Sequence, residues 1–131
     1  MHRALQPEGW AKPQGYANGV VARGRVITLA GQIGWNARSE FESDDLIDQI
    51  AQALRNIVAV LACDDASPQH IVNLNWYFVD KREYVSRLPE VGKVYRDIIG
   101  KHFPAMTAVQ VSALIEDRAK VEIQATAIVP D

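Results

Sequence analysis

Cysteine, long apolar runs and an excess of positive charge are all scarce or missing in this sequence of 131 residues. The single cysteine, Cys63, excludes an intrachain disulfide, so a reducing cytoplasm is the expected location. The first residues lack the apolar core of a signal peptide, and no run is long enough for a membrane-spanning helix. A formal net charge of −2 indicates no excess of positive charge that would attract nucleic acid or an acidic membrane. We therefore expect a cytoplasmic protein that binds neither.

The familiar catalytic motifs are missing as well. His2, His70 and His102 are scattered without the spacing of metal ligands, so we expect no metal site. The sequence has no phosphate-binding glycine loop, no Gly-x-Ser-x-Gly elbow and no Cys-x-x-Cys pair. No pattern around Cys63 indicates an activated nucleophile, so we interpret it as a packing residue at a helix end.

Two runs near the C-terminus alternate strictly between apolar and other residues, which predicts strands with one face on a core. They are Phe103 to Leu114 and Lys120 to Val129, joined by a short charged segment. An antiparallel hairpin is the simplest interpretation. In the second run, Glu122 lies on the less apolar side. That side must face solvent, a partner subunit or a site.

The remaining sequence predicts one α+β domain over residues 1–131, with the order ββαβαββ. Residues 1–14 are rich in proline and glycine and are expected to be an irregular arm. The other expected strands are 16–22 and 26–33, around a tight turn, and 71–79; the expected helices are 43–63, capped by Ser43 or Asp44, and 84–102. Within the second helix, Pro89 could mark the true first turn. The glycines of segment 30–36 fit either an ordinary strand end or a close approach of the backbone to another group.

Two helices can cover only one face of a sheet of five or six strands. The opposite face is too apolar for plain solvent exposure and too polar for the core of a monomer. We therefore expect it to pack against other subunits in a closed oligomer. The residues assigned to this face are Asn73, Asn75, Tyr77, Gln110, Ser112, Leu114, Glu122, Gln124, Thr126 and Ile128.

Several segments, taken in order, resemble the Rid (RidA/YjgF, reactive imine deaminase) family over about residues 13–130. They are Tyr16, Ala30-Gly-Gln-Ile33, Gln49-x-x-Gln-Ala-Leu-x-Asn-Ile-x-x-Val-Leu61, Phe103-Pro-Ala105 with Val109-Gln-Val111 and Leu114, and Lys120-Val-Glu-Ile123. The resemblance implies a chorismate-mutase-like fold, with a mixed β-sheet of five to six strands and two helices on one face. It also implies a homotrimer with ligand clefts between subunits. Archetypal members hydrolyse small enamines and imines to keto acids and ammonia, without a cofactor.

The resemblance gives roles to three residues. Glu122 matches the acid that holds the attacking water, Tyr16 a tyrosine that lines the cleft, and Gly31 a backbone contact to the substrate. Judged from the sequence alone, an exposed strand carboxylate is the preferred interpretation of Glu122, and the resemblance reverses that preference. Tyr16 fits an aromatic residue packed at a subunit contact as well as it fits a ligand-stacking role.

Met106 is the clearest departure from the family pattern. The archetype has an arginine there, which pairs with the substrate carboxylate through two parallel hydrogen bonds, and a thioether offers no such donors. The further departures are Ala30 for a serine, Gly92 for an asparagine and Ala108 for a small thiol. We therefore expect a wider and less polar cleft, as in a subgroup that lacks the arginine. The remaining candidate substrate contacts are Trp35, Asn36 and Thr107.

Two functions of different classes follow. The first is a small-molecule hydrolase or deaminase that acts on a reactive enamine, imine or related amine without arginine-mediated carboxylate capture. A ring-bearing or less charged substrate, such as an amino-dienoate, is one candidate. The second is a non-catalytic, trimeric small-molecule-binding protein on the same fold. Ribonuclease activity is a weaker third hypothesis, because the acidic balance and the lack of a basic groove argue against it.

Overall fold

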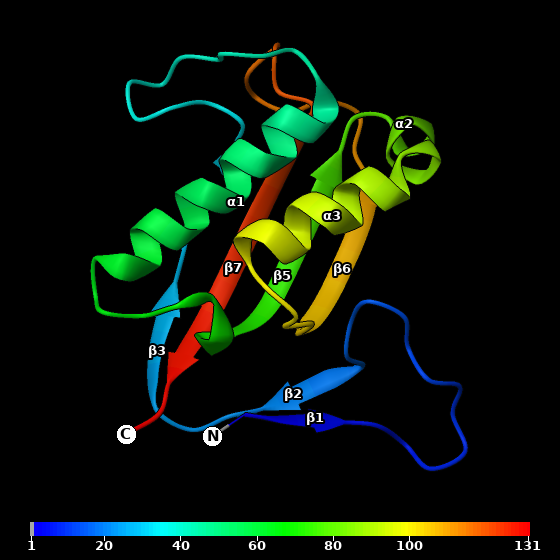
Figure 1. The fold of residues 1–131 in the computed structure, drawn as a ribbon, viewed down its shortest axis with the longest axis vertical. Helices are drawn as coiled ribbons and strands as arrows, with labels where there is room; N and C mark the ends of the chain where they lie inside the picture. The colour runs from blue at the N-terminus through cyan, green and yellow to red at the C-terminus, as the bar shows by residue number, and fades with distance from the viewer. Residues whose placement is uncertain (1) are drawn as a thin grey trace.

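A mixed five-stranded sheet forms the frame of the protein in the computed structural model, which describes residues 2–131 (Figure 1). The strands of this sheet are β3 (Arg25–Thr28), β4 (Gln32–Ile33), β5 (Ile71–Phe78), β6 (Ala105–Gln110) and β7 (Val121–Val129). Their hydrogen-bonded order is β3-β7-β5-β6, and β4 also pairs with β7. The predicted α+β class and the mixed sheet are confirmed.

Helices α1 (Leu46–Ala62) and α3 (Leu88–Ile98) cross the same face of the sheet (Figure 1). Apolar residues at spacings of three and four on α1 are buried against β7, which alternates between buried and half-exposed residues. The core lies between this helical layer and the sheet. Its largest fully buried members include Phe78, Leu54, Ile57, Leu74 and Ile123.

The start of α1 is one or two residues later than the sequence predicts. Asp45, rather than Ser43 or Asp44, is the N-cap, and its carboxylate accepts hydrogen bonds from the backbone N–H groups of Ile47 and Asp48. The same carboxylate pairs with Arg87 at 2.7 Å, which lowers the pKa of Asp45. This ion pair joins the start of α1 to the start of α3.

The predicted second helix is divided in two. Helix α2 (Lys81–Ser86) begins after the N-cap Asp80, and α3 follows a break at Arg87. Pro89 stands in the first turn of α3, where its missing N–H costs nothing. The helix ends before residue 102 because Gly100 adopts a positive φ of 96°. Between α1 and β5 there is also a short 3-10 turn, η1 (Pro68–His70).

The predicted C-terminal hairpin is wrong. Strand β6 pairs in parallel with β5, and β5 pairs antiparallel with β7, so β5 lies between the two strands that were expected to be neighbours. Strand β6 ends at Gln110 rather than Leu114, which leaves residues 111–120 as a connection long enough to pass β5. Alternation correctly predicted the buried face of β7, but it carries no information on which strand pairs with which.

The N-terminal pairing also differs from the prediction. Strand β1 (Arg3–Leu5) lies inside the arm expected to be irregular and pairs antiparallel with β2 (Gly19–Val21). Strand β3 pairs with β7 instead of β2, so the expected hairpin around residues 23–25 does not form. Gly24 has a φ of 144°, and a side chain there would overlap the backbone of Val129. Met1, which also belongs to the predicted arm, lies outside the described residues.

The face of the sheet opposite α1 and α3 has the mixed character that the sequence predicts, with some corrections. Gln110 is paired with the buried Phe78 on the helical side, and its side chain accepts a hydrogen bond from the backbone N–H of Lys81 at 2.9 Å. Ser112 and Leu114 lie beyond β6. Thr107 and Val109 of β6 share this face instead, because they pair with Asn75 and Tyr77.

Among residues 2–131, no helix is long and apolar enough to cross a membrane.

One buried amide connects three separate segments. The side chain of Gln49 is 1% exposed and donates hydrogen bonds to the carbonyl groups of Ser43 and Arg118 at 3.1 and 3.0 Å. Its own carbonyl oxygen accepts a hydrogen bond from the backbone N–H of Lys120 at 2.8 Å. Gln49 therefore fixes the approach to α1 and the last residues before β7 relative to each other.

Replacing Gln49 by leucine should lower the free energy of unfolding by about 2–4 kcal/mol, because three buried backbone groups lose their partner. Denaturant unfolding followed by circular dichroism measures the change. Gln52→Leu is the matched control, since the Gln52 side chain makes a single hydrogen bond, to Asn56. An equal decrease in the free energy of unfolding of both variants would show that the three hydrogen bonds of Gln49 do not stabilise the protein more than the single one of Gln52.

Candidate functional site

Five of the residues predicted to form the site fall into two groups on opposite sides of the sheet, and the other two, Trp35 and Asn36, join neither group. Glu122 pairs with Tyr77 and lies on the uncovered face, near Gly31. Met106 pairs with Leu74 on the helical side, where it lines a cavity together with Tyr16. Thr107, the next residue, faces the uncovered side because side chains alternate along a strand. Within one chain, the proposed acid and the residue that replaces the family arginine are therefore separated by the sheet.

Glu122 is half-buried in a small recess of about 290 Å³. The recess is lined by Gly31, Tyr77, Val111, Ala113, Leu114, Glu122 and Gln124. None of the ion pairs formed among residues 2–131 involves Glu122. Its carboxylate is therefore available to accept hydrogen bonds from a water molecule or a ligand.

Gly31 leaves the space that the Glu122 carboxylate occupies. A Cβ atom at Gly31 would overlap this carboxylate and lie 2.8 Å from its Cδ. The following strand, β4, holds the approach in place, since Ile33 pairs with Glu122 and Gln32 with Ile123. Of the two interpretations open for the 30–36 segment, the structure supports a close approach of the backbone.

Helix α1 anchors the segment that follows Gly31. The Asn56 side chain donates hydrogen bonds to the carbonyl groups of Ile33 and Trp35 at 3.1 and 2.9 Å. Gly34 packs directly on Gln49, and a Cβ atom at Gly34 would lie 2.5 Å from the Cβ of Gln49. The polar residues in the family-like 49–61 segment thus support the backbone beside Glu122.

Trp35 and Asn36 belong to neither cavity. The Trp35 ring packs on Phe41 with centroids 5.9 Å apart. The Asn36 side chain donates to Glu42 at 2.9 Å and accepts from the backbone N–H groups of residues 38 and 40. Both side chains shape the 35–42 loop, and their predicted substrate contacts remain a hypothesis.

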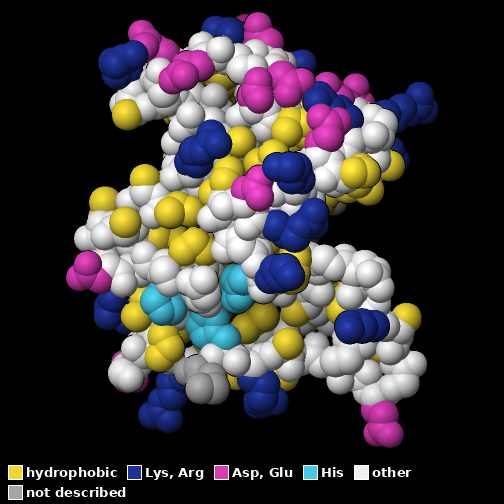
Figure 2. All heavy atoms as spheres, viewed as in Figure 1, with side chains coloured by type: hydrophobic (Ala, Val, Ile, Leu, Met, Phe, Trp, Pro, Cys, Tyr) yellow, Lys and Arg dark blue, Asp and Glu magenta, His cyan; other side chains and the backbone are white. Residues whose placement is uncertain are grey.

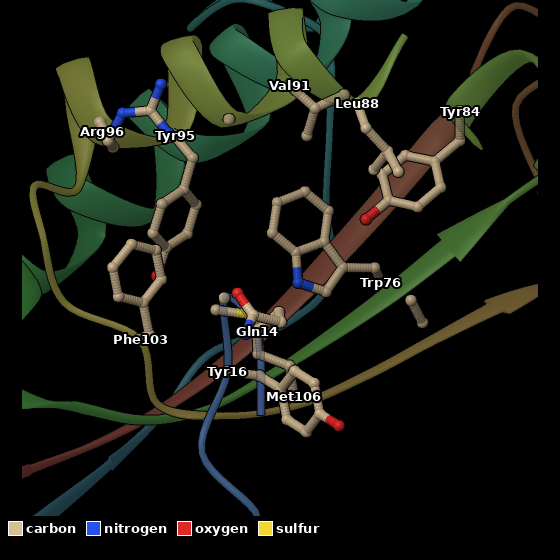
Figure 3. Close-up of a pocket in the computed structure, with 13 residues that line it drawn as sticks. Gln14, Tyr16, Trp76, Tyr84, Leu88, Val91, Tyr95, Arg96, Phe103 and Met106 are labelled. Carbon is tan, nitrogen blue, oxygen red and sulfur yellow. The ribbon is translucent and has the colours of Figure 1, made fainter. Parts of the chain in front are cut away.

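The largest concentration of aromatic residues lies on the helical side, around a cavity of about 550 Å³ (Figure 3). Its lining residues are Gln14, Gly15, Tyr16, Trp76, Tyr84, Leu88, Val91, Gly92, Tyr95, Arg96, Phe103, Met106 and Ala108. The cavity thus combines Tyr16 with Gly92, Met106 and Ala108, three positions at which the resemblance described above implies a departure from the family pattern. A volume of this size is typical of small-molecule sites.

Two tyrosines of this cavity keep their protons at neutral pH. Burial raises the pKa of Tyr84 and of Tyr95. The Tyr95 hydroxyl donates a hydrogen bond to the carbonyl of His102, which joins α3 to the approach of β6. Apart from Arg96, the lining residues of the cavity are therefore uncharged, and many of them are aromatic.

Sequence patterns did not identify Trp76, Tyr84 or Arg96 as site residues. Trp76 alternates with other core residues of β5, so its pattern matches ordinary packing. Tyr84 lies on α2, which the sequence merged with α3. Arg96 has the pattern of a solvated helical face. A signal that could have identified Arg96 is its spacing from Gly92, because residues four apart on a helix are neighbours.

The histidine side chains gather near the two chain termini but do not form a metal site (Figure 2). His2 Nε2 and His102 Nε2 are bonded to the carbonyl groups of Ile128 and Ile71 at 2.8 and 2.7 Å. Among residues 2–131, no cluster of three or more histidine, cysteine, aspartate or glutamate residues could hold a metal ion.

Known proteins with similar sequences and structures show which family the chain resembles. The family model described as Endoribonuclease L-PSP matches residues 10–129. The chain is 30% identical to a RutC family protein of Pyrococcus horikoshii, over 97% of this chain and 98% of that protein. It is 28% identical to the 2-iminobutanoate/2-iminopropanoate deaminase of Dermatophagoides farinae, over 90% of this chain and 89% of that protein.

The crystal structure of a Rid-family protein of unknown function from Yersinia pestis superimposes with a TM-score of 0.86. The two chains are 30% identical, and the match covers 98% of each. This confirms the chorismate-mutase-like α+β fold implied by the sequence resemblance. With a family match over nearly the whole length and relatives of this similarity, the chain belongs to the Rid family, also known by the names YjgF, RutC and L-PSP.

Proposed function

We propose that the protein is a cofactor-independent hydrolase that deaminates a reactive enamine, imine or related small amine. The observation that carries the proposal is the Glu122 carboxylate, half-buried in its recess and without an ion-pair partner among residues 2–131. The similarity to a protein named 2-iminobutanoate/2-iminopropanoate deaminase supports the same reaction class.

The chemistry needs few groups. Hydrolysis of a C=N bond requires a protonated nitrogen, a positioned water and a base of modest strength. Glu122 would hold the water and accept its proton as the oxygen attacks the imine carbon. The resulting carbinolamine then loses ammonia and leaves a carbonyl product. Gly31 would present its backbone to the substrate beside that water.

A second candidate function is a small-molecule-binding protein without catalysis. One observation favours it: Glu122 and the aromatic cavity lie on opposite sides of the sheet in a single chain. Ammonia release from a panel of freshly generated imines separates the two functions. Ribonuclease activity, which the name of the family model mentions, receives little support from a chain with a formal net charge of −2.

A homotrimer would reconcile the two groups by bringing Glu122 of one subunit next to the cavity of another. The uncovered face also carries apolar side chains at both edges of the sheet, namely Val26, 60% exposed, and Val109, 42% exposed. Burial of these residues between subunits would be favourable. Light scattering at micromolar concentration should therefore return the mass of three chains. A monomer mass would rule out a site shared between subunits.

Replacing Glu122 by glutamine should lower imine turnover about a hundredfold or more, because the amide cannot accept the proton of the attacking water. Ammonia release under saturating substrate measures the effect, and light scattering checks that the oligomer is unchanged. Glu116→Gln in the exposed 115–118 segment is a control with the same loss of charge. Unchanged turnover in a folded Glu122→Gln variant would return this carboxylate to a structural role.

The natural protein should hydrolyse small 2-imino acids poorly. Met106 gives their carboxylate no donor, and desolvating an unpaired charge is costly. Met106→Arg should strengthen the binding of a simple keto acid, because a charge-assisted pair offsets that cost. Recovery of turnover should be smaller, since Ala30, Gly92 and Ala108 also differ. The measurement uses 2-iminobutanoate generated in situ; a rate equal to that of an arginine-bearing relative would show that another group binds the carboxylate.

A further inference from the structure

The helical-side cavity has walls suited to a flat ring. The Trp76 ring lies 6.2 Å from Tyr95, and Tyr95 stacks on Phe103 at 5.6 Å with an interplanar angle of 19°. Tyr84 lies on the other side of the same cavity (Figure 3). Met106 lies among these rings, and a thioether makes favourable contacts with aromatic groups. Offset or tilted aromatic neighbours favour a planar, π-bearing ligand over an aliphatic one.

One polar atom in the wall lacks a partner. Trp76 is 4% exposed, and its indole Nε1 is one of two buried side-chain nitrogen atoms without a hydrogen bond among residues 2–131. Figure 3 shows this nitrogen on the edge of the indole that faces Gln14 and Met106, two flexible side chains of the cavity. A buried donor normally has an acceptor, so the site favours a ligand that supplies one.

A cation stands at the cavity without a carboxylate partner. Arg96 is exposed and forms none of the ion pairs found among residues 2–131, whereas Arg87, the N-cap residue of the same helix, is held by Asp45 and Glu90. Gly92, one turn earlier, leaves the Arg96 guanidinium room, since a Cβ atom there would lie 3.0 Å from Nη1. The cavity wall thus includes a positive group without an ion-pair partner and a buried neutral donor without an acceptor among residues 2–131.

We propose that this cavity binds a planar aromatic carboxylic acid that carries a second oxygen on its ring. The ring lies among Trp76, Tyr84 and Tyr95, the second oxygen accepts a hydrogen bond from Trp76 Nε1, and the carboxylate pairs with Arg96. Arg96 supplies this charge from helix α3, on a different wall from Met106, so it serves a ring-bearing acid and not the small 2-imino acids considered above. This assignment rests on the proposed function insofar as it names the substrate class, but it concerns binding and is tested without turnover.

The first probe is 4-hydroxybenzoate, with binding to the full-length protein measured by isothermal titration calorimetry. Benzoate lacks the second oxygen, 4-hydroxybenzamide lacks the charge, and cyclohexanecarboxylate lacks the aromatic ring. 4-Hydroxybenzoate should bind at least about tenfold more tightly than each of the other three. Equal binding of the acid and the amide would overturn the role of Arg96, and equal binding of the two ring types would overturn the aromatic site.

Variants test the Arg96 contact and the Trp76 contact separately. Arg96→Gln should weaken 4-hydroxybenzoate about tenfold or more and leave 4-hydroxybenzamide unchanged. Arg55→Gln on the exposed side of α1 is the control, with the same charge change and no expected effect. Trp76→Phe should bring the affinities of 4-hydroxybenzoate and benzoate together. This comparison of two ligands within one variant stays valid if the variant is less stable, and a preserved difference would overturn the Trp76 contact.

The outcomes also distinguish this inference from the proposed function. Tight, Arg96-dependent binding without ammonia release from any imine would support the cavity and contradict the hydrolase. Imine hydrolysis that requires Glu122 but is not inhibited by 4-hydroxybenzoate would support the hydrolase and contradict the cavity assignment.

Discussion

Strand β7 is bonded along both edges, and the rest of the structure depends on that constraint. One edge pairs with β3 and β4, and the other pairs with β5. Its inward side chains, such as Ile123 and Ala125, are buried against α1, so a shift of one residue would expose the core. The same register fixes the outward position of Glu122. The chemistry proposed for this carboxylate therefore rests on a strand that cannot slide.

The polar residues of α1 carry this constraint to the backbone beside Glu122. Gln49 holds the residues that precede β7, and Asn56 holds the end of β4. The missing side chain of Gly34 leaves room for Gln49. Both amides form hydrogen bonds with backbone groups of these segments. A buried and fully bonded amide is worth more for geometry than for net stability. The recess at Glu122 is thus preorganised by side chains that never contact it.

Periodicity in the sequence was enough to predict the class of the fold and the buried face of β7, because side chains alternate with a period of two whatever the neighbour. It could not predict strand neighbours, which depend on a connection at 111–120 that passes β5. The sequence prediction also placed Gln110 on the uncovered face, which is wrong. The face of each β6 side chain is set by the pairing of β6 with β5, and periodicity does not reveal that pairing. Trp76 and Arg96 escaped notice because a core tryptophan and a solvated arginine look ordinary until the cavity between them is visible.

In the proposed function, the uncovered face of the sheet holds the base and the helical side holds the residues that select the ligand. On the uncovered face, Glu122 and Gly31 line a recess that, in the proposed reaction, would hold only the water and the C=N carbon. On the helical side, Gly92, Met106 and Ala108 offer no polar side chain, while the unpartnered Trp76 Nε1 and Arg96 line the same cavity. Substitutions confined to the second side would change the substrate without disturbing the base. A family fold can in this way keep its reaction class while the arginine is lost from β6, provided that a neighbouring subunit brings the two sides together.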